Sequence, residues 1–81
     1  MMNHKQAKTG TRVKFTENTI MAAKGDTGTI HELRGYNFEN GKKASRYVFV
    51  WVTRTTPAIG NAPARITQSN CMATTSVLEA I

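Results

Sequence analysis

The stretch Arg46–Arg54 reads RYVFVWVTR and decides the fold, because it is the most β-prone run in the chain. Its apolar side chains alternate between two faces, as the side chains of a β-strand do. One face carries Tyr47, Phe49, Trp51 and Thr53, and the other carries Val48, Val50 and Val52. Since both faces are apolar and an arginine closes each end, the stretch is predicted to be the central strand of a small β domain.

The alternation leaves open which of the two faces is the interior. If the aromatic face is the core, the three valines need cover from residues 17–25, from the C-terminus or from a partner. If the valine face is the core, the aromatic rings lie outside, where a ligand can reach them. In either case the strand offers more apolar surface than a five-stranded domain needs, which favours a homodimer or a docked protein partner.

The residues before this strand predict a long hairpin. Asn40-Gly41 is the strongest short-range hairpin signal in the chain, so it should join a strand over Thr27–Phe38 to the central strand, with a bend near Gly35. Upstream, Thr11–Thr16 is predicted to be the first strand. Gly28 lies just inside the second strand, where a glycine indicates a bulge or a close backbone approach.

The apolar residues of the second strand do not fit one regular register. A two-residue turn at the hairpin tip places Leu33 opposite Val48 and Ile30 opposite Trp51. Those two pairs lie on different faces, because Ile30 and Leu33 are an odd number of residues apart. Either a bulge intervenes or one of the two side chains lies outside.

The C-terminal third is predicted to consist of short strands and loops. We expect a loop over 55–63, a strand over 64–68 with Ile66 inward, a turn over 69–75 and a last strand over 76–81. A short helix over Met72–Ile81 is the alternative, because apolar residues there also follow helical spacing.

These elements describe an all-β protein, a small five-stranded SH3-like barrel with a long central hairpin. At 81 residues the chain forms one domain, over residues 11–81, preceded by a flexible basic arm over residues 1–10. The single cysteine, Cys71, excludes an internal disulfide and fits a reducing compartment. Because no apolar run is long enough for a membrane helix, the expected location is the cytoplasm.

Two stretches within residues 13–30 resemble the KOW pattern of transcription elongation factors and ribosomal proteins. Val13-Lys14-Phe15 is similar to its V-x-V strand, and Lys24–Ile30 (KGDTGTI) is similar to the K-G-x-x-G-x-V/I run that leads into the next strand. The resemblance implies an SH3-like barrel and permits a partner in the transcription machinery. The ending Leu78–Ile81 is also similar to the last strand of SH3-like barrels, including small plasmid-borne reductases whose active-site strand motif is missing here.

Nothing in the chain predicts an enzyme, a cofactor or a metal site. The five carboxylates lie in settings typical of solvated strands and turns, so no pair is placed for acid–base catalysis. His31 and Glu32 are neighbours in a strand and should point to opposite faces. One cysteine and two distant histidines do not make a zinc site, and Cys71 is expected to be a half-buried structural thiol.

The charge pattern favours binding to a polyanion. The net charge is +6, and the long hairpin interleaves cations, which neutralise phosphates, with aromatic rings, on which bases stack. A small basic domain can also carry such charge simply to stay soluble. The candidate nucleic-acid-binding residues are Lys14, Lys24, Arg34, Lys42, Lys43, Arg46, Tyr47, Trp51 and Arg54.

Two functions follow from this pattern. The first is a non-catalytic module that binds single-stranded RNA or DNA through the basic and aromatic residues of the hairpin. The alternative is a protein-interaction module, such as a phage or mobile-element accessory factor that docks on an acidic surface of a host enzyme or of the transcription machinery. No membrane partner is expected.

Overall fold

The structure, a computed structural model, describes residues 2–81 and consists of one five-stranded antiparallel sheet. The strands are β1 (Arg12–Phe15), β2 (Thr27–Glu39), β3 (Lys42–Thr56), β4 (Arg65–Thr74) and β5 (Leu78–Ala80). Two 3₁₀ turns accompany them, η1 (His4–Gln6) and η2 (Thr75–Val77). The all-β class, the five strands and the long central hairpin are thus confirmed. Within residues 2–81 no helix has the length and apolarity needed to cross a membrane.

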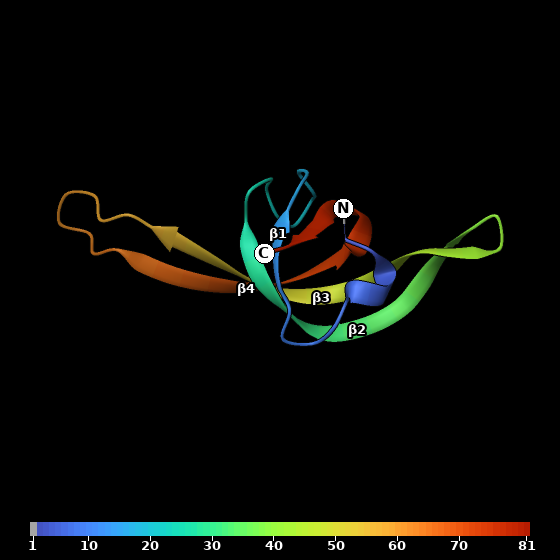
Figure 1. The fold of residues 1–81 in the computed structure, drawn as a ribbon. Helices are drawn as coiled ribbons and strands as arrows, with labels where there is room; N and C mark the ends of the chain where they lie inside the picture. Colours follow the sequence, from blue (N-terminus) through green and yellow to red (C-terminus); the bar gives the residue numbers. More distant parts are fainter. Residues whose placement is uncertain (1) are drawn as a thin grey trace.

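The sheet is curved, but over the described residues it is not closed as a barrel. The strand order is β4-β3-β2-β1-β5, and the two outer strands pair only with β3 and with β1. Figure 1 shows β1, both termini and the 3₁₀ turns above the curve of β2 and β3, while two hairpin ends extend to opposite sides. The molecule is therefore elongated, 55 × 21 × 18 Å. Membership of the KOW or SH3-like families stays a prediction.

The valine face of β3 is the interior of the protein. Val48, Val50 and Val52 are at most 1% exposed, whereas Trp51 on the opposite face is 42% exposed. The curve of the sheet brings this face against further side chains from β1, β2 and β5. The remaining large side chains that are fully buried are Val13, Phe15, Ile30 and Leu78. The aromatic rings of β3 are therefore not the core.

A bulge in β2 resolves the register of the long hairpin. Asn40 and Gly41 both have positive φ (52° and 75°), as a two-residue hairpin turn requires. Leu33 lies opposite Val48 as predicted, but a register shift between Ile30 and Glu32 moves Ile30 opposite Val50 instead of Trp51. Ile30 is thereby fully buried. Of the two alternatives, the bulge is the one that the structure adopts.

In the C-terminal third a connection between β3 and β4 is present over residues 57–64, close to the predicted loop, but the predicted turn at 69–75 is wrong. β4 is continuous over Arg65–Thr74, where a turn was expected at 69–75, and β5 is confined to Leu78–Ala80. The cause is pairing with β3 along the whole of β4, which holds polar residues of low β propensity in a strand. Ile66 points outward with 73% of its surface exposed, because its part of β4 extends beyond the core.

The N-terminal segment packs against the sheet rather than standing away from it. Met2 and Ala7 are buried, and the Met2 N–H donates to the Leu78 carbonyl oxygen at 2.7 Å. The Asn3 side chain caps η1 by accepting from the Lys5 N–H. The flexibility expected for residues 1–10 stays a prediction; residue 1 lies outside the described residues, and residues 2–10 lie against the body of the protein.

The connection between β1 and β2 is held at one point by the single cysteine. Ala22 is buried, and the Cys71 thiol donates to the Met21 carbonyl oxygen at 3.4 Å. Cys71 is only 2% exposed, so it is fully buried rather than half-buried. Ile20 and Met21 stay exposed, however, so the connection covers the core with one small residue and leaves its larger side chains outside.

Gly28 lies where β2 and β3 approach most closely. A Cβ atom at this position would meet the Trp51 carbonyl oxygen and would lie 2.7 Å from Val50 Cγ1. Both neighbours belong to the central strand and are fixed by its pairing with β2. Only glycine fits here, which confirms the close backbone approach predicted from the sequence.

We expect Gly28→Ala to lower the free energy of unfolding by about 1–3 kcal/mol, because overpacking forces the two strands apart. The matched control is Gly35→Ala in the same strand, where a Cβ meets no atom within 4 Å. Urea denaturation followed by Trp51 fluorescence measures both. Equal effects of the two substitutions would show that the close approach is not what position 28 requires.

Candidate nucleic-acid interface

The outer face of the sheet is built by cross-strand rows of residues. Because residues paired across antiparallel strands point to the same side, the residues paired with Trp51 share its face. Trp51 pairs with Thr29 of β2 and Asn70 of β4, and Thr29 pairs in turn with Arg12 of β1. The next row joins Lys14, Thr27, Thr53 and Gln68 in the same way. Two cations of β1 therefore lie on the face that carries the aromatic rings of β3.

Trp51 is held in a fixed and open position. The His31 ring stacks on its indole, with 4.8 Å between ring centroids and an angle of 27°. His31 Nε2 in turn donates to Asn70 Oδ1 at 2.7 Å. His31 is the extra residue of the bulge in β2: Ile30 pairs with Val50 and Glu32 with Phe49, while His31 has no partner on β3. Its side chain can therefore lie against the indole. The indole thus keeps 42% of its surface exposed while one side rests on a second ring.

The rest of the outer face is an apolar hollow beside an arginine. Its lining residues are Arg34, Tyr47, Phe49 and Met72, around a volume of about 480 Å³. The Arg34 guanidinium lies 5.0 Å from the centre of the Phe49 ring and 3.1 Å from Glu32. The ion pair between Arg34 and Glu32 is exposed to water on both sides and is therefore weak, so Arg34 can exchange Glu32 for another anion. The hollow therefore combines ring surface with a positive charge at its rim.

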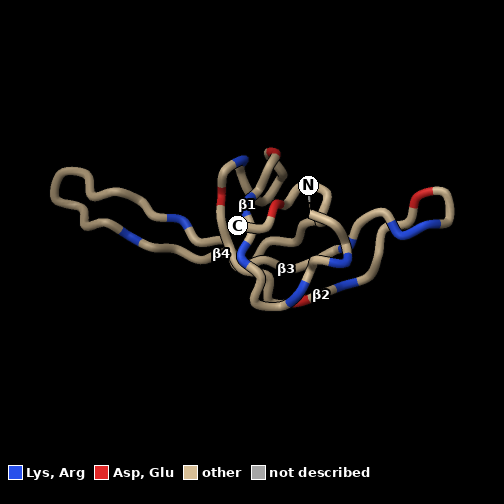
Figure 2. The backbone as a smooth tube through the Cα atoms, in the orientation of Figure 1, with Lys and Arg blue, Asp and Glu red and all other residues tan. Residues whose placement is uncertain are grey.

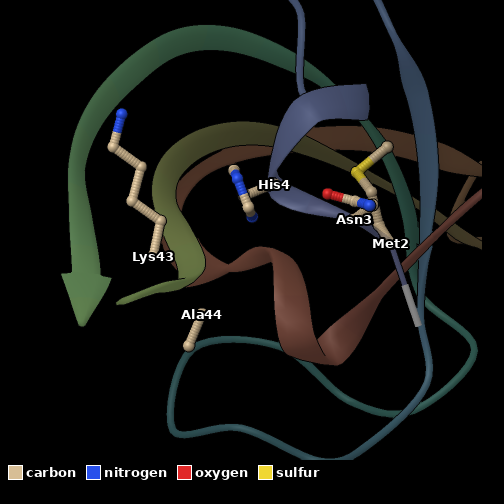
Figure 3. A pocket seen from close by; sticks show the side chains of 5 residues that line it. All are labelled: Met2, Asn3, His4, Lys43 and Ala44. Atoms are coloured by element: carbon tan, nitrogen blue, oxygen red, sulfur yellow. The ribbon is translucent and has the colours of Figure 1, made fainter. Parts of the chain in front are cut away.

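A second group of cations surrounds Tyr36 near the N-terminal segment. Lys43 Nζ lies 4.2 Å and the Arg46 guanidinium 4.8 Å from the centre of the Tyr36 ring, and His4 meets the ring edge-on. Figure 3 shows His4 and Lys43 on either side of an open hollow of about 350 Å³ between the N-terminal segment and the start of β3. Lys43 and Arg46 are therefore engaged with Tyr36 rather than with Trp51.

The remaining predicted cations are not among the residues of either group. Lys42 follows the turn at the hairpin tip, and Lys24 lies in the connection before β2. Arg54 donates through Nε and Nη2 to one oxygen of Asp26, at 3.2 and 2.7 Å, so its charge is already partnered. Of the nine predicted site residues, Arg34, Tyr47 and Trp51 lie on the same part of the outer face. Lys14 belongs to the same side of the sheet but lies on β1, two strands away from Trp51.

Arg12, Phe49 and His31 also belong to this face but were not among the predicted site residues. Arg12 had a visible signal, because it shares the alternation of Lys14 and therefore the same side of β1. Phe49 had the same signal, since it stands between Tyr47 and Trp51. For His31 the sequence holds no such signal, because the bulge in β2 decides that its ring lies against the indole.

The described residues show no grouping that suggests metal chemistry. Among residues 2–81, no three His, Cys, Asp or Glu side chains gather as metal ligands would. Burial raises the pKa of the Cys71 thiol, so it forms the reactive thiolate less readily than an exposed cysteine does. The absence of an enzymatic activity stays a prediction.

Comparisons with known proteins identify no relative of this chain. No protein-family model, no curated protein and no solved structure matches it.

The ion pair between Asp26 and Arg54 predicts a loss of stability in acid. Burial alone would raise the pKa of Asp26, but the Ala23 N–H and the Arg54 guanidinium outweigh it and hold the pKa below its ordinary value. A lowered pKa means that the ionised carboxylate stabilises the fold above the pKa of the unfolded chain, and that this contribution is lost as the pH falls.

We expect Asp26→Asn to lower the free energy of unfolding by roughly 1 kcal/mol at pH 7, and this difference from the wild type to shrink below about pH 4. Urea denaturation at a series of pH values measures it. Glu17→Gln serves as a control, because this exposed carboxylate has no ion-pair partner within the described part of the chain. A difference that stays constant down to pH 2.5 (about one unit below an ordinary Asp pKa) would contradict the assignment.

Proposed function

We propose that the protein binds single-stranded nucleic acid on the outer face of its sheet. The observation that carries the proposal is the exposed Trp51 indole, which is stacked on His31. Strand pairing through Thr29 of β2 places Arg12 of β1 in the same cross-strand row as Trp51. A flat ring that is fixed from behind and open in front is a platform on which a base can stack. Cations beside it attract the phosphates.

The spacing of the rings on β3 suits an extended strand of nucleotides. Tyr47, Phe49 and Trp51 are alternate residues and therefore lie about 7 Å apart along the sheet. Each exposed ring that stacks a base contributes ~1–3 kcal/mol without reading its identity. Bases in a duplex are already stacked on each other and cannot use such rings, so the outer face favours single strands.

The cations flank the row of rings on two sides. Arg12 and Lys14 lie on β1, beyond β2 from Trp51, and Arg34 lies against Phe49. For single strands, each neutralised phosphate contributes about −0.7 to the slope of log K against log salt concentration, so three contacts give a slope of about −2. The expected binding is thus salt-dependent and largely independent of sequence.

The alternative function, docking on an acidic protein surface, is favoured by one observation. The hollow lined by Arg34, Tyr47, Phe49 and Met72 is mainly apolar and would accept a protein side chain as readily as a base. Such docking would bury the same rings but would not require a free single strand. A phage or mobile-element accessory factor that holds a host enzyme would work in this way.

We expect a fluorescently labelled oligothymidylate to bind with a salt slope of about −2, measured by anisotropy between 25 and 200 mM salt. Lys14→Ala should reduce the magnitude of the slope by about 0.7. Trp51→Ala should weaken binding about 5- to 150-fold, the equivalent of ~1–3 kcal/mol. Both side chains are exposed, so neither substitution removes core packing.

The matched control is Arg65→Ala, which also removes one positive charge but lies on the arm of β4, away from the rings. It should leave affinity and slope nearly unchanged. The oligonucleotide should also protect Trp51 of the wild type from acrylamide quenching. No binding at 25 mM salt, or equal losses with Lys14→Ala and Arg65→Ala, would rule out this interface.

A further inference from the structure

The outer edge of β4 has no partner strand among residues 2–81. β4 lies at one end of the strand order and pairs over its ten residues with β3 alone. Figure 1 shows its first half extending from the body along the arm that it forms with the end of β3. A free edge of this length exposes a row of backbone N–H and C=O groups that can receive another strand.

This edge lacks the devices that normally prevent strand addition. Protected edges carry lysines or prolines, or are covered by another segment. Residues 55–78 contain one charged side chain, Arg65, although the whole chain has a net charge of +6 (Figure 2). No proline lies within β4 itself. The least charged part of the molecule is therefore also its longest open edge.

Exposed apolar side chains mark both ends of the open edge. Ile66 and Met72 lie on the same face of β4, because they are an even number of residues apart, and are 73% and 48% exposed. Beside Met72 is a hollow of about 460 Å³ that Ile20 and Met21 line with it. Ile20 is fully exposed at its rim.

We propose that a second copy of this chain pairs with β4 in antiparallel fashion, centred on Ser69. In that register Ile66 of each copy lies opposite Met72 of the other and reaches the hollow beside it. The same twofold axis places Gln68 opposite Asn70. The contact is self-complementary, as a two-fold symmetric interface must be, and uses both exposed ends of the edge at once.

A second copy fits this edge better than a charged partner does. β4 itself carries one cation, Arg65, and the neighbouring Arg54 of β3 is paired with Asp26. A phosphate backbone or an acidic protein therefore meets no row of opposite charges along this edge. The cations of β1 lie three strands away, so two copies that join at β4 keep Arg12 and Lys14 apart and lower their mutual repulsion. This interface uses residues other than the rings and cations proposed to bind nucleic acid, and does not depend on that function.

Sedimentation equilibrium of the full chain tests the pairing. We expect the mass to rise from that of the monomer to that of the dimer with protein concentration. Ile66→Lys should raise the dimer dissociation constant at least tenfold. The control, Ile59→Lys, makes the same change at a similarly exposed residue near the tip of the same arm and should have little effect.

Disulfide trapping tests the register. Two Ser69 residues at the twofold axis would have Cα atoms about 4.5–5.5 Å apart, within the range that a disulfide spans. Ser69→Cys should therefore form a covalent dimer rapidly on mild oxidation. Thr55→Cys, in β3 of the same arm, should not, and the buried Cys71 is present in both variants.

A chain that stays monomeric up to millimolar concentration would overturn the proposal. Equal effects of Ile66→Lys and Ile59→Lys would also overturn it, because the contact would then depend on the arm as a whole. If Ser69→Cys crosslinks no faster than Thr55→Cys, the pairing centred on Ser69 is wrong. Circular dichroism of each variant shows that the strands are retained.

Discussion

Burial of Val48, Val50 and Val52 is the constraint on which the rest of the structure depends. These side chains are the central part of a small core, and each contributes roughly 1.5 kcal/mol or more by leaving water. Because Gly28 has no side chain, it leaves room for the Val50 Cγ1 methyl, which lies 2.7 Å from where a Cβ atom would stand. With the valines inside, strand geometry forces every ring of β3 to the outside.

The outer face is therefore a consequence of the core and not a separate construction. The rings stand on a paired strand, so the backbone fixes their spacing and side, as a rigid scaffold does for a binding site. The bulge that buries Ile30 also turns His31 beneath the indole of Trp51. One local irregularity thus serves both faces of the sheet, since it completes the core on one and supports the stacking platform on the other.

Charge is distributed unevenly along the molecule. Cations gather on β1, at Arg34 and around Tyr36, while residues 55–78 contain a single charged residue, Arg65. The arm that ends β3 and begins β4 is therefore a sparsely charged extension of a basic body. Pairing of two β4 edges would join the outer faces of two copies into one surface, and a nucleic-acid strand bound there would meet two sets of rings.

The sequence by itself determined the all-β class, the positions of β1 to β3, the Asn40-Gly41 turn and the separation of valines from rings. These features depend on neighbours in the chain, through turn chemistry and the two-residue period of a strand. The fourth strand was predicted too short, because residues 69–74 form a strand only by pairing with β3.

Tertiary structure alone decided which side of the central strand is buried. A two-residue period defines two faces but treats them alike, so the choice depends on what the rest of the chain can place against each. Phe15 and Leu78 are buried with the valines, and Gly28 leaves room for Val50. The candidate site follows from the same choice, because burial of the valine face leaves the Trp51 ring exposed on the opposite face.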